Sequence, residues 1–86
     1  MPPAYQLIIQ PSAERDLRSL PKTDIKRIAR RIQFLVGNPR PAGCRKLSDT
    51  TFRVRQGDYR ILYDVDDKAR TVTFLKIGHR REVYRS

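Results

Sequence analysis

The residues best suited to chemistry are two arginines in a segment of alternating character. Within residues 51–55, Arg53 and Arg55 alternate with Phe52 and Val54. Side chains along a β-strand point to opposite faces in turn, so both guanidinium groups lie on one face, about 6 to 7 Å apart. That distance is close to the spacing of phosphates along a nucleic-acid strand. The segment predicts a phosphate-binding row, with a solvated strand face as the plainer alternative.

Further basic residues could extend this row into a groove. Arg60 follows the turn at residues 56–58 and comes to lie beside the row if residues 51–65 form a hairpin. The other candidate phosphate ligands are Arg45, Lys46, Arg80, Arg81 and Arg85. Tyr59, Tyr63 and Tyr84 offer rings on which unpaired bases could stack, which favours single-stranded RNA over a duplex. For Tyr59 and Tyr63, ordinary packing in a sheet is the simpler interpretation.

Few groups in the chain can move a proton. There is one histidine, and the sequence has neither a glycine-rich phosphate loop nor a cluster of metal ligands, so we expect no metal site and no cofactor. Cleaving RNA without a metal needs a base for the 2′-hydroxyl, cations for the phosphoryl oxygens and an acid for the leaving oxygen. Arginine stays protonated and supplies only the cations, which leaves His79 and Tyr84 as proton carriers. The alternatives are a solvated histidine and a docked terminal tyrosine.

The net charge indicates a polyanionic partner. Nineteen Lys and Arg against nine Asp and Glu give a formal net charge of +10. Counterion release favours phosphate contacts, so we expect nucleic acid first, then an acidic protein segment or an anionic membrane. The single cysteine, Cys44, excludes an internal disulfide, and no apolar run approaches the roughly 20 residues of a membrane span. With no secretion signal, the expected location is the cytoplasm.

The elements that must position these residues follow from the periodicity of the apolar side chains. Residues 5–10 read as a strand, and residues 12–20 as a short helix with Ser12 as its N-cap. Residues 22–36 read as an amphipathic helix that ends at Gly37. Its apolar side comprises Ile25, Ile28, Ala29, Ile32, Leu35 and Val36, and its basic side Lys26, Arg27, Arg30 and Arg31. Residues 51–55, 59–65 and 71–77 then read as three strands.

This order predicts an α+β fold, β-α-α-β-β-β. Eighty-six residues allow one compact domain, spanning residues 1–86. The two helices form a hairpin packed on one face of a mostly antiparallel sheet, which leaves the other face for function. A short basic tail follows the last strand.

Two stretches resemble the signature segments of RelE-type toxins, from the RelE/ParE toxin–antitoxin superfamily. They are residues 52–63 (FRVRQGDYRILY) and residues 77–85 (IGHRREVYR), and the likeness continues through residues 11–17 and the Asn-Pro connector at residues 38–39. The resemblance implies a RelE-like type II toxin that enters the ribosomal A site and cleaves the mRNA codon exposed there, inhibiting translation. It also implies silencing by a cognate acidic antitoxin in a higher-order hetero-oligomer.

Matching the family pattern residue by residue assigns roles to Arg53, Arg55, Arg60, Arg80 and Tyr84. Arg60 would grip the scissile phosphate, Arg80 would assist the leaving group, and Tyr84 would stack on or orient the nucleotide. The two strand positions are lysines in the best-known members and arginines here, so the base must be another group, and His79 or Tyr84 is expected to fill that role. The competing interpretations are a ParE-type inhibitor of DNA gyrase and a non-catalytic RNA- or ribosome-binding domain.

Overall fold

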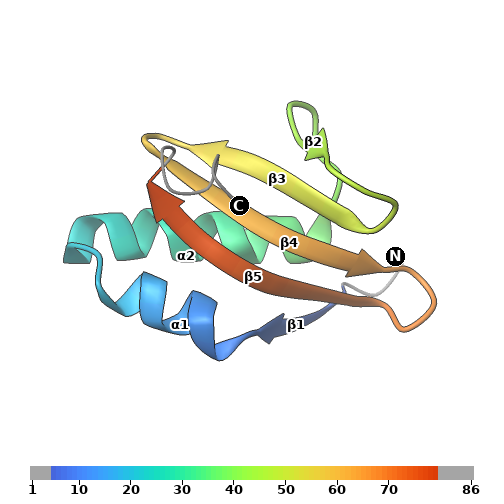
Figure 1. The fold of residues 1–86 in the computed structure, drawn as a ribbon, viewed down its shortest axis with the longest axis horizontal. Coiled ribbons are helices and arrows are strands. Elements are labelled where there is room, and N and C mark those ends of the chain that lie inside the picture. Colours follow the sequence, from blue (N-terminus) through green and yellow to red (C-terminus); the bar gives the residue numbers. More distant parts are fainter. Residues whose placement is uncertain (1–4, 80–86) are drawn as a thin grey trace.

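The computed structural model describes residues 5–79, which form two helices and a five-stranded sheet (Figure 1). In chain order the elements are β1 (Gln6–Ile9), α1 (Pro11–Arg18), α2 (Lys22–Gly37), β2 (Arg45–Lys46), β3 (Thr51–Gln56), β4 (Tyr59–Asp66) and β5 (Thr71–His79). The strands lie side by side in the order β1-β5-β4-β3-β2. Only β1 runs parallel to its neighbour, and the other pairings are antiparallel. The predicted α+β order is confirmed, with β2 as an additional strand.

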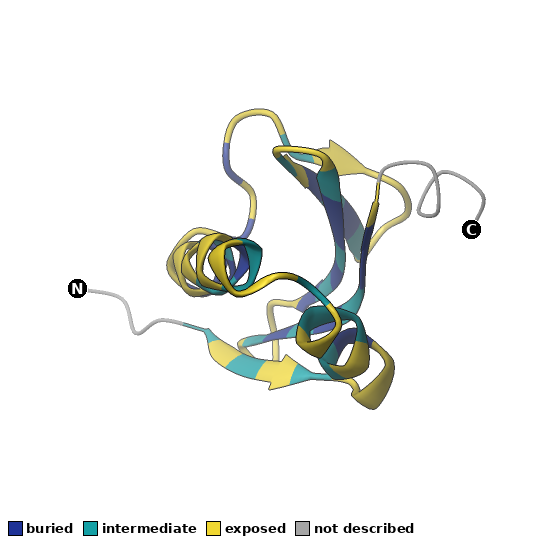
Figure 2. Cartoon of the chain, turned by 90° about the vertical axis from the view of Figure 1, so that its left-hand side faces the viewer, coloured by how far each residue is buried: buried dark blue, intermediate teal, exposed yellow. Residues whose placement is uncertain are grey.

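Both helices cover the same side of the sheet, and the core lies between the two layers (Figure 2). Burial alternates along β3, where Phe52 and Val54 are 4% and 1% exposed while Arg55 is exposed. Facing them, α2 buries Ile28, Ile32 and Leu35 at three- and four-residue spacing. The predicted helix-covered face is therefore present, and we call the opposite side the outer face of the sheet.

Tyr63 is fully buried in this core and stacks between Phe52 and Phe74, with ring centroids 6.0 and 5.8 Å away. Its hydroxyl donates a 2.6 Å hydrogen bond to the carbonyl of Pro39, so the polar end of the ring is satisfied. Burial raises the pKa of this hydroxyl above its ordinary value. The packing interpretation of Tyr63 is confirmed, and the ring cannot stack on RNA.

Two predicted helix ends are wrong. Helix α1 begins at Pro11 with Gln10 as its N-cap, because proline's fixed φ suits the first turn of a helix. Ser12 is therefore not a cap, and its hydroxyl instead donates a 3.0 Å bond to the carbonyl of Leu75. Helix α2 includes Gly37, and the chain leaves it at Asn38, whose φ is −146°. Gly37 is thus not the left-handed residue that was expected.

Helix α1 also protects an edge of the sheet. Strand β1 pairs with β5 only as far as Phe74, so the later part of β5 has no strand beside it on that side. There the Ser12 hydroxyl donates to the carbonyl of Leu75, and the carboxylate of Asp16 accepts a 3.0 Å bond from the backbone N–H of Ile77. Two backbone groups in the part of β5 that β1 does not pair are therefore satisfied by side chains of α1, which hold the end of β5 in place.

Candidate nucleic-acid interface

Four arginines gather at one end of the outer face. Within the hairpin, Arg55 lies directly opposite Arg60, and Arg53 lies opposite Arg45 of β2. Directly opposed residues lie on the same face of a sheet, so all four side chains project from the outer face. Together with Gly43 and Val54 they line an open hollow of about 320 Å³. We call Arg45, Arg53, Arg55 and Arg60 the arginine groove.

The environment differs from one arginine of the groove to the next. Arg60 is only 7% exposed, whereas Arg45 and Arg55 are exposed. The guanidinium of Arg55 donates a 3.3 Å bond to the carbonyl of Gly57 in the turn, which directs its side chain toward the hairpin tip. A buried guanidinium has few rotamers and little water around it, so it acts on an anion more strongly than an exposed one. Arg60 is the most buried arginine of the groove.

The other end of the outer face is acidic. Asp49, Asp64, Asp66 and Asp67 line a separate hollow beside the turn between β4 and β5. The Thr51 hydroxyl donates a 2.6 Å bond to Asp64, and Arg40 makes two bonds to Asp67, at 3.2 and 2.8 Å. The hydrogen bonds from Arg40, and after them the one from the Tyr5 hydroxyl, hold the pKa of Asp67 below its usual range. The outer face thus carries four arginines toward the hairpin end and four carboxylates, with Arg40 and Lys68, toward the other end, so the hairpin end attracts a polyanion more strongly.

His79 lies on the opposite side of the sheet from the groove. It pairs with Tyr59, whereas Arg60 pairs with Gly78, and neighbouring residues of a strand point to opposite faces. An irregularity in the pairing explains this position: Tyr63 faces Phe74 and Leu62 faces Lys76, so Leu75 is an extra residue in β5. Strict alternation from residue 71 would have placed His79 on the outer face, and the bulge reverses it.

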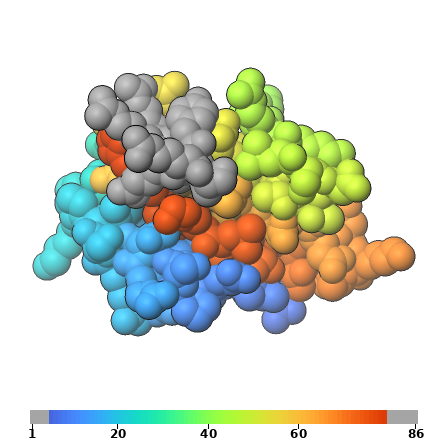
Figure 3. All heavy atoms as spheres, viewed as in Figure 1, coloured from blue at the N-terminus to red at the C-terminus, as the bar shows by residue number. Residues whose placement is uncertain are grey.

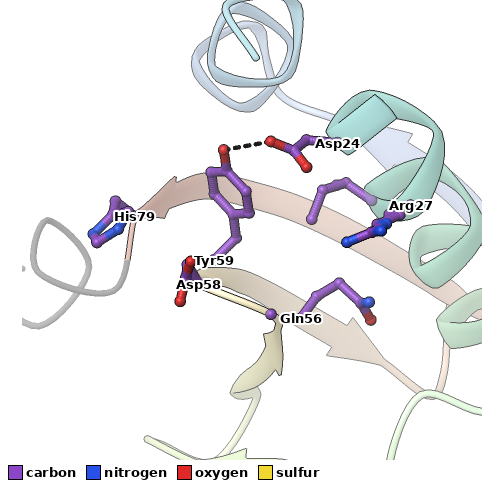
Figure 4. A pocket seen from close by; sticks show the side chains of 8 residues that line it. Asp24, Arg27, Gln56, Asp58, Tyr59 and His79 are labelled. Atoms are coloured by element: carbon purple, nitrogen blue, oxygen red, sulfur yellow. Dashed lines mark hydrogen bonds between the residues drawn. The ribbon is translucent and has the colours of Figure 1, made fainter. Parts of the chain in front are cut away.

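On the helix side, His79 joins a small pocket of about 220 Å³ at the tip of the hairpin (Figure 4). The Tyr59 hydroxyl donates a 2.9 Å bond to Asp24 of α2, and this bond raises the pKa of Tyr59. The Tyr59 ring meets His79 edge-on, with centroids 6.3 Å apart. Tyr59 is thus a packing residue, as its simpler interpretation predicted, and Asp24 is the partner that sequence periodicity did not identify.

The remaining candidates fall into two groups, and one residue that was not predicted joins the outer face. Lys46 pairs with Phe52 and so starts from the helix side of the sheet, away from Arg45. Arg80, Arg81, Tyr84 and Arg85 lie outside the described residues. Lys76 was not predicted, yet it lies opposite Leu62 on the outer face, with its ammonium group 3.8 Å from Asp16. Only the pairing register places Lys76 there, because the bulge falls just before it.

Figure 3 looks onto the outer face, where β4 and β5 show between α1 below and the segment around β2 above. Among residues 5–79, no three His, Cys, Asp or Glu side chains are placed to hold a metal ion. No helix within the same range is long and apolar enough to cross a membrane.

Comparison with known proteins identifies the family. A family model described as the ParE toxin of the type II toxin–antitoxin system parDE matches residues 7–84. Toxin RelG of Mycobacterium tuberculosis is 34% identical, over 94% of this chain and 97% of that protein. The chain belongs to the RelE/ParE superfamily of toxins. This RelE-type toxin is thus a toxin component of a type II toxin–antitoxin system.

Solved structures agree with this placement of the toxin. The RelBE2 toxin–antitoxin complex of Mycobacterium tuberculosis contains a chain that is 31% identical, with a TM-score of 0.79, covering 90% of the toxin and 99% of that chain. The archaeal RelE–RelB complex of Pyrococcus horikoshii gives 27% identity and a TM-score of 0.78, covering 90% and 96%. The RelE-like fold expected from the sequence is confirmed.

Proposed function

We propose that this toxin is a metal-independent endoribonuclease that cleaves mRNA in the ribosomal A site and so inhibits translation. The observation that carries the proposal is the arginine groove: four guanidinium groups on one face, in register across three strands. Phosphodiester cleavage builds negative charge on the phosphoryl oxygens, and preorganised cations at that point stabilise the transition state. An exposed face with its arginines toward one end suits a single RNA strand that the ribosome holds in place.

In this mechanism Arg60 binds the scissile phosphate, and Arg55 stabilises the negative charge that develops on the phosphoryl oxygens. Arg53 and Arg45 bind the neighbouring phosphate, because they start about two residues further along the strands. The 2′-hydroxyl attacks the phosphorus once its proton is removed, and the 5′-oxygen leaves with a proton from an acid. The arginines stay charged throughout and transfer no proton.

The base that we propose is Tyr84, which takes the proton of the 2′-hydroxyl, while the leaving 5′-oxygen takes a proton from water and Arg80 stabilises its negative charge. His79 starts from the helix side of the sheet and faces Tyr59, which favours Tyr84 over His79. We propose that Arg81 and Arg85 bind flanking phosphates. A Tyr84→Phe variant should lose cleavage, and His79→Gln should keep it.

We further propose that an acidic antitoxin silences the toxin by covering the arginine groove. The relative from Mycobacterium tuberculosis was solved as a toxin–antitoxin complex, and the one from Pyrococcus horikoshii as a RelE–RelB complex. A chain of net charge +10 with an open basic groove attracts an acidic segment that competes with RNA for the same cations. The free toxin should act in the cytoplasm, where the ribosomes are.

The test is to add the toxin to translating ribosomes in a cell-free system and map the new RNA ends. Codon-phased breaks that require the ribosome, and that disappear with Arg60→Gln, are the expected result. Intact RNA would contradict the proposal.

A second candidate function follows from the matching family model, which describes a ParE toxin. A ParE-type protein inhibits DNA gyrase by binding and cuts no RNA. A gyrase supercoiling assay separates the two functions: the nuclease proposal expects no inhibition, and inhibition with accumulated gyrase–DNA cleavage complexes would favour the ParE-type function.

A further inference from the structure

Helix α2 carries a second basic surface that the arginine groove does not include. Arg27, Arg30, Arg31 and Phe34 recur at spacings of three and four residues, so they form one stripe along the helix. The buried side of α2 faces the sheet, and its exposed side faces away from it (Figure 2). We call these four residues the α2 stripe.

The α2 stripe is open and lacks carboxylates. Its four side chains and Gln56 line a hollow of about 460 Å³. Among the described residues, no Asp or Glu forms an ion pair with Arg27, Arg30 or Arg31. Arg27 also borders the Tyr59 pocket, which contains Asp24 and Asp58, whereas Arg30 and Arg31 do not line that pocket. The three guanidinium groups outnumber these two carboxylates, so the stripe keeps a net positive charge that an external anion can reach.

Phe34 makes this surface more than a solvated basic face. The ring is 49% exposed, which is unusual for a phenylalanine, and the Arg31 guanidinium lies 5.3 Å from its centroid. An aromatic ring beside a guanidinium plane is an arrangement on which an unpaired base stacks. Arg27 and Arg31 are about 6 Å apart along the helix axis, which is close to the spacing of neighbouring phosphates.

We propose that the α2 stripe binds the backbone and an unpaired base of ribosomal RNA while the arginine groove holds the mRNA. The inference rests on the proposed function, because it takes the ribosome as the particle that the toxin enters. Two cationic surfaces, one on the outer face of the sheet and one on the side of α2 that borders Gln56 at the end of β3, let a small domain bridge two RNA segments. The groove then determines cleavage, and the α2 stripe determines affinity for the ribosome.

The test compares an Arg27→Ala/Arg30→Ala variant with an Arg15→Ala/Arg18→Ala variant. Alanine favours the helix in both, both lose two charges, and Arg15 and Arg18 lie on exposed positions of α1. The probe for binding is the empty 70S ribosome, measured over a series of salt concentrations. A lost phosphate contact lowers the salt slope by about 0.9 and the affinity roughly eight-fold at 0.1 M salt.

We expect the α2 double variant to bind ribosomes roughly 60-fold more weakly, with a salt slope lower by about 2. On programmed ribosomes its KM for cleavage should rise while kcat stays the same, and the α1 variant should match the wild type within about two-fold. Phe34→Leu, which keeps the apolar bulk but removes the ring face, should weaken binding several-fold.

Equal ribosome affinity and equal salt slope for the two double variants would overturn the inference. So would a loss of affinity for the acidic antitoxin alone, which would make the α2 stripe a protein-docking surface. Failure of the proposed function is a different result: the wild type would leave mRNA intact, whatever its affinity for the ribosome.

Discussion

Replacing Arg60 by glutamine tests the arginine groove at its most buried position. Glutamine keeps part of the length and polarity of arginine and removes the charge. At about 4 Å, a unit charge pair is worth about 4 kcal/mol at the effective dielectric constant near 20 of a partly buried site, and about 1 kcal/mol in bulk water. Arg60 is 7% exposed and Arg45 is exposed, so the two residues fall near these two limits.

These energies convert into rates at about 1.4 kcal/mol for each factor of ten. Arg60→Gln should therefore lower single-turnover cleavage on programmed ribosomes roughly 10²- to 10³-fold, in the range found when one oxyanion donor is removed. Arg45→Gln should cost about five-fold. Arg60→Lys should recover only part of the loss, because an ammonium group lacks the planar two-pronged geometry of guanidinium.

The control is Arg15→Gln on the exposed side of α1, which removes the same charge far from the groove. Urea unfolding of each variant separates catalysis from folding. If Arg60→Gln were folded and cleaved within two-fold of the wild type, or if Arg45→Gln lost more than Arg60→Gln, the argument from burial would be refuted.

Four further outcomes are expected. Tyr63→Phe leaves the buried Pro39 carbonyl without its donor and should lower the free energy of unfolding by about 1 to 3 kcal/mol in urea; no change would show that the hydrogen bond adds nothing. Tyr84→Phe should slow cleavage at least 100-fold, while His79→Gln should cleave within a few-fold of the wild-type rate and keep the wild-type pH–rate profile. The reverse pattern would identify His79 as the proton carrier. Asp67→Asn should lower the melting temperature at pH 7. Because folding lowers the pKa of Asp67, its carboxylate stabilises the fold fully above the ordinary carboxyl pKa of about 3.9, and this stabilisation is lost as the pH falls through the lowered pKa. The difference in melting temperature between the wild type and Asp67→Asn should therefore shrink in acid, and a difference that grew would contradict the account. Antitoxin affinity should fall with added salt, and a salt-independent affinity would remove the electrostatic account of silencing.

The arginine row was predictable because period-two alternation depends on nothing beyond the strand itself. Phe52 and Val54 had to face the core, so Arg53 and Arg55 had to face away from it. Hairpin pairing then brings Arg60 opposite Arg55. The helices followed in the same way from the three- and four-residue spacing of their apolar side chains.

Features that depend on tertiary context could not be predicted in this way. Strand β2 has two residues, Arg45 and Lys46, and no apolar residue to mark it. The bulge at Leu75 reverses the side of every later residue in β5, so the position of His79 and the presence of Lys76 on the outer face depend on a pairing irregularity. The contact of Asp24 with Tyr59 joins residues 35 apart, and nothing local in either segment signals it.

The measurement that bears most directly on the central claim is the mapping of mRNA 5′ ends after the toxin is added to ribosomes stalled with a known codon in the A site. Cleavage within that codon, absent without ribosomes and reduced at least 100-fold by Arg60→Gln, is what the arginine groove predicts. Intact mRNA with the wild-type toxin, or cleavage that Arg60→Gln leaves unchanged, would contradict it.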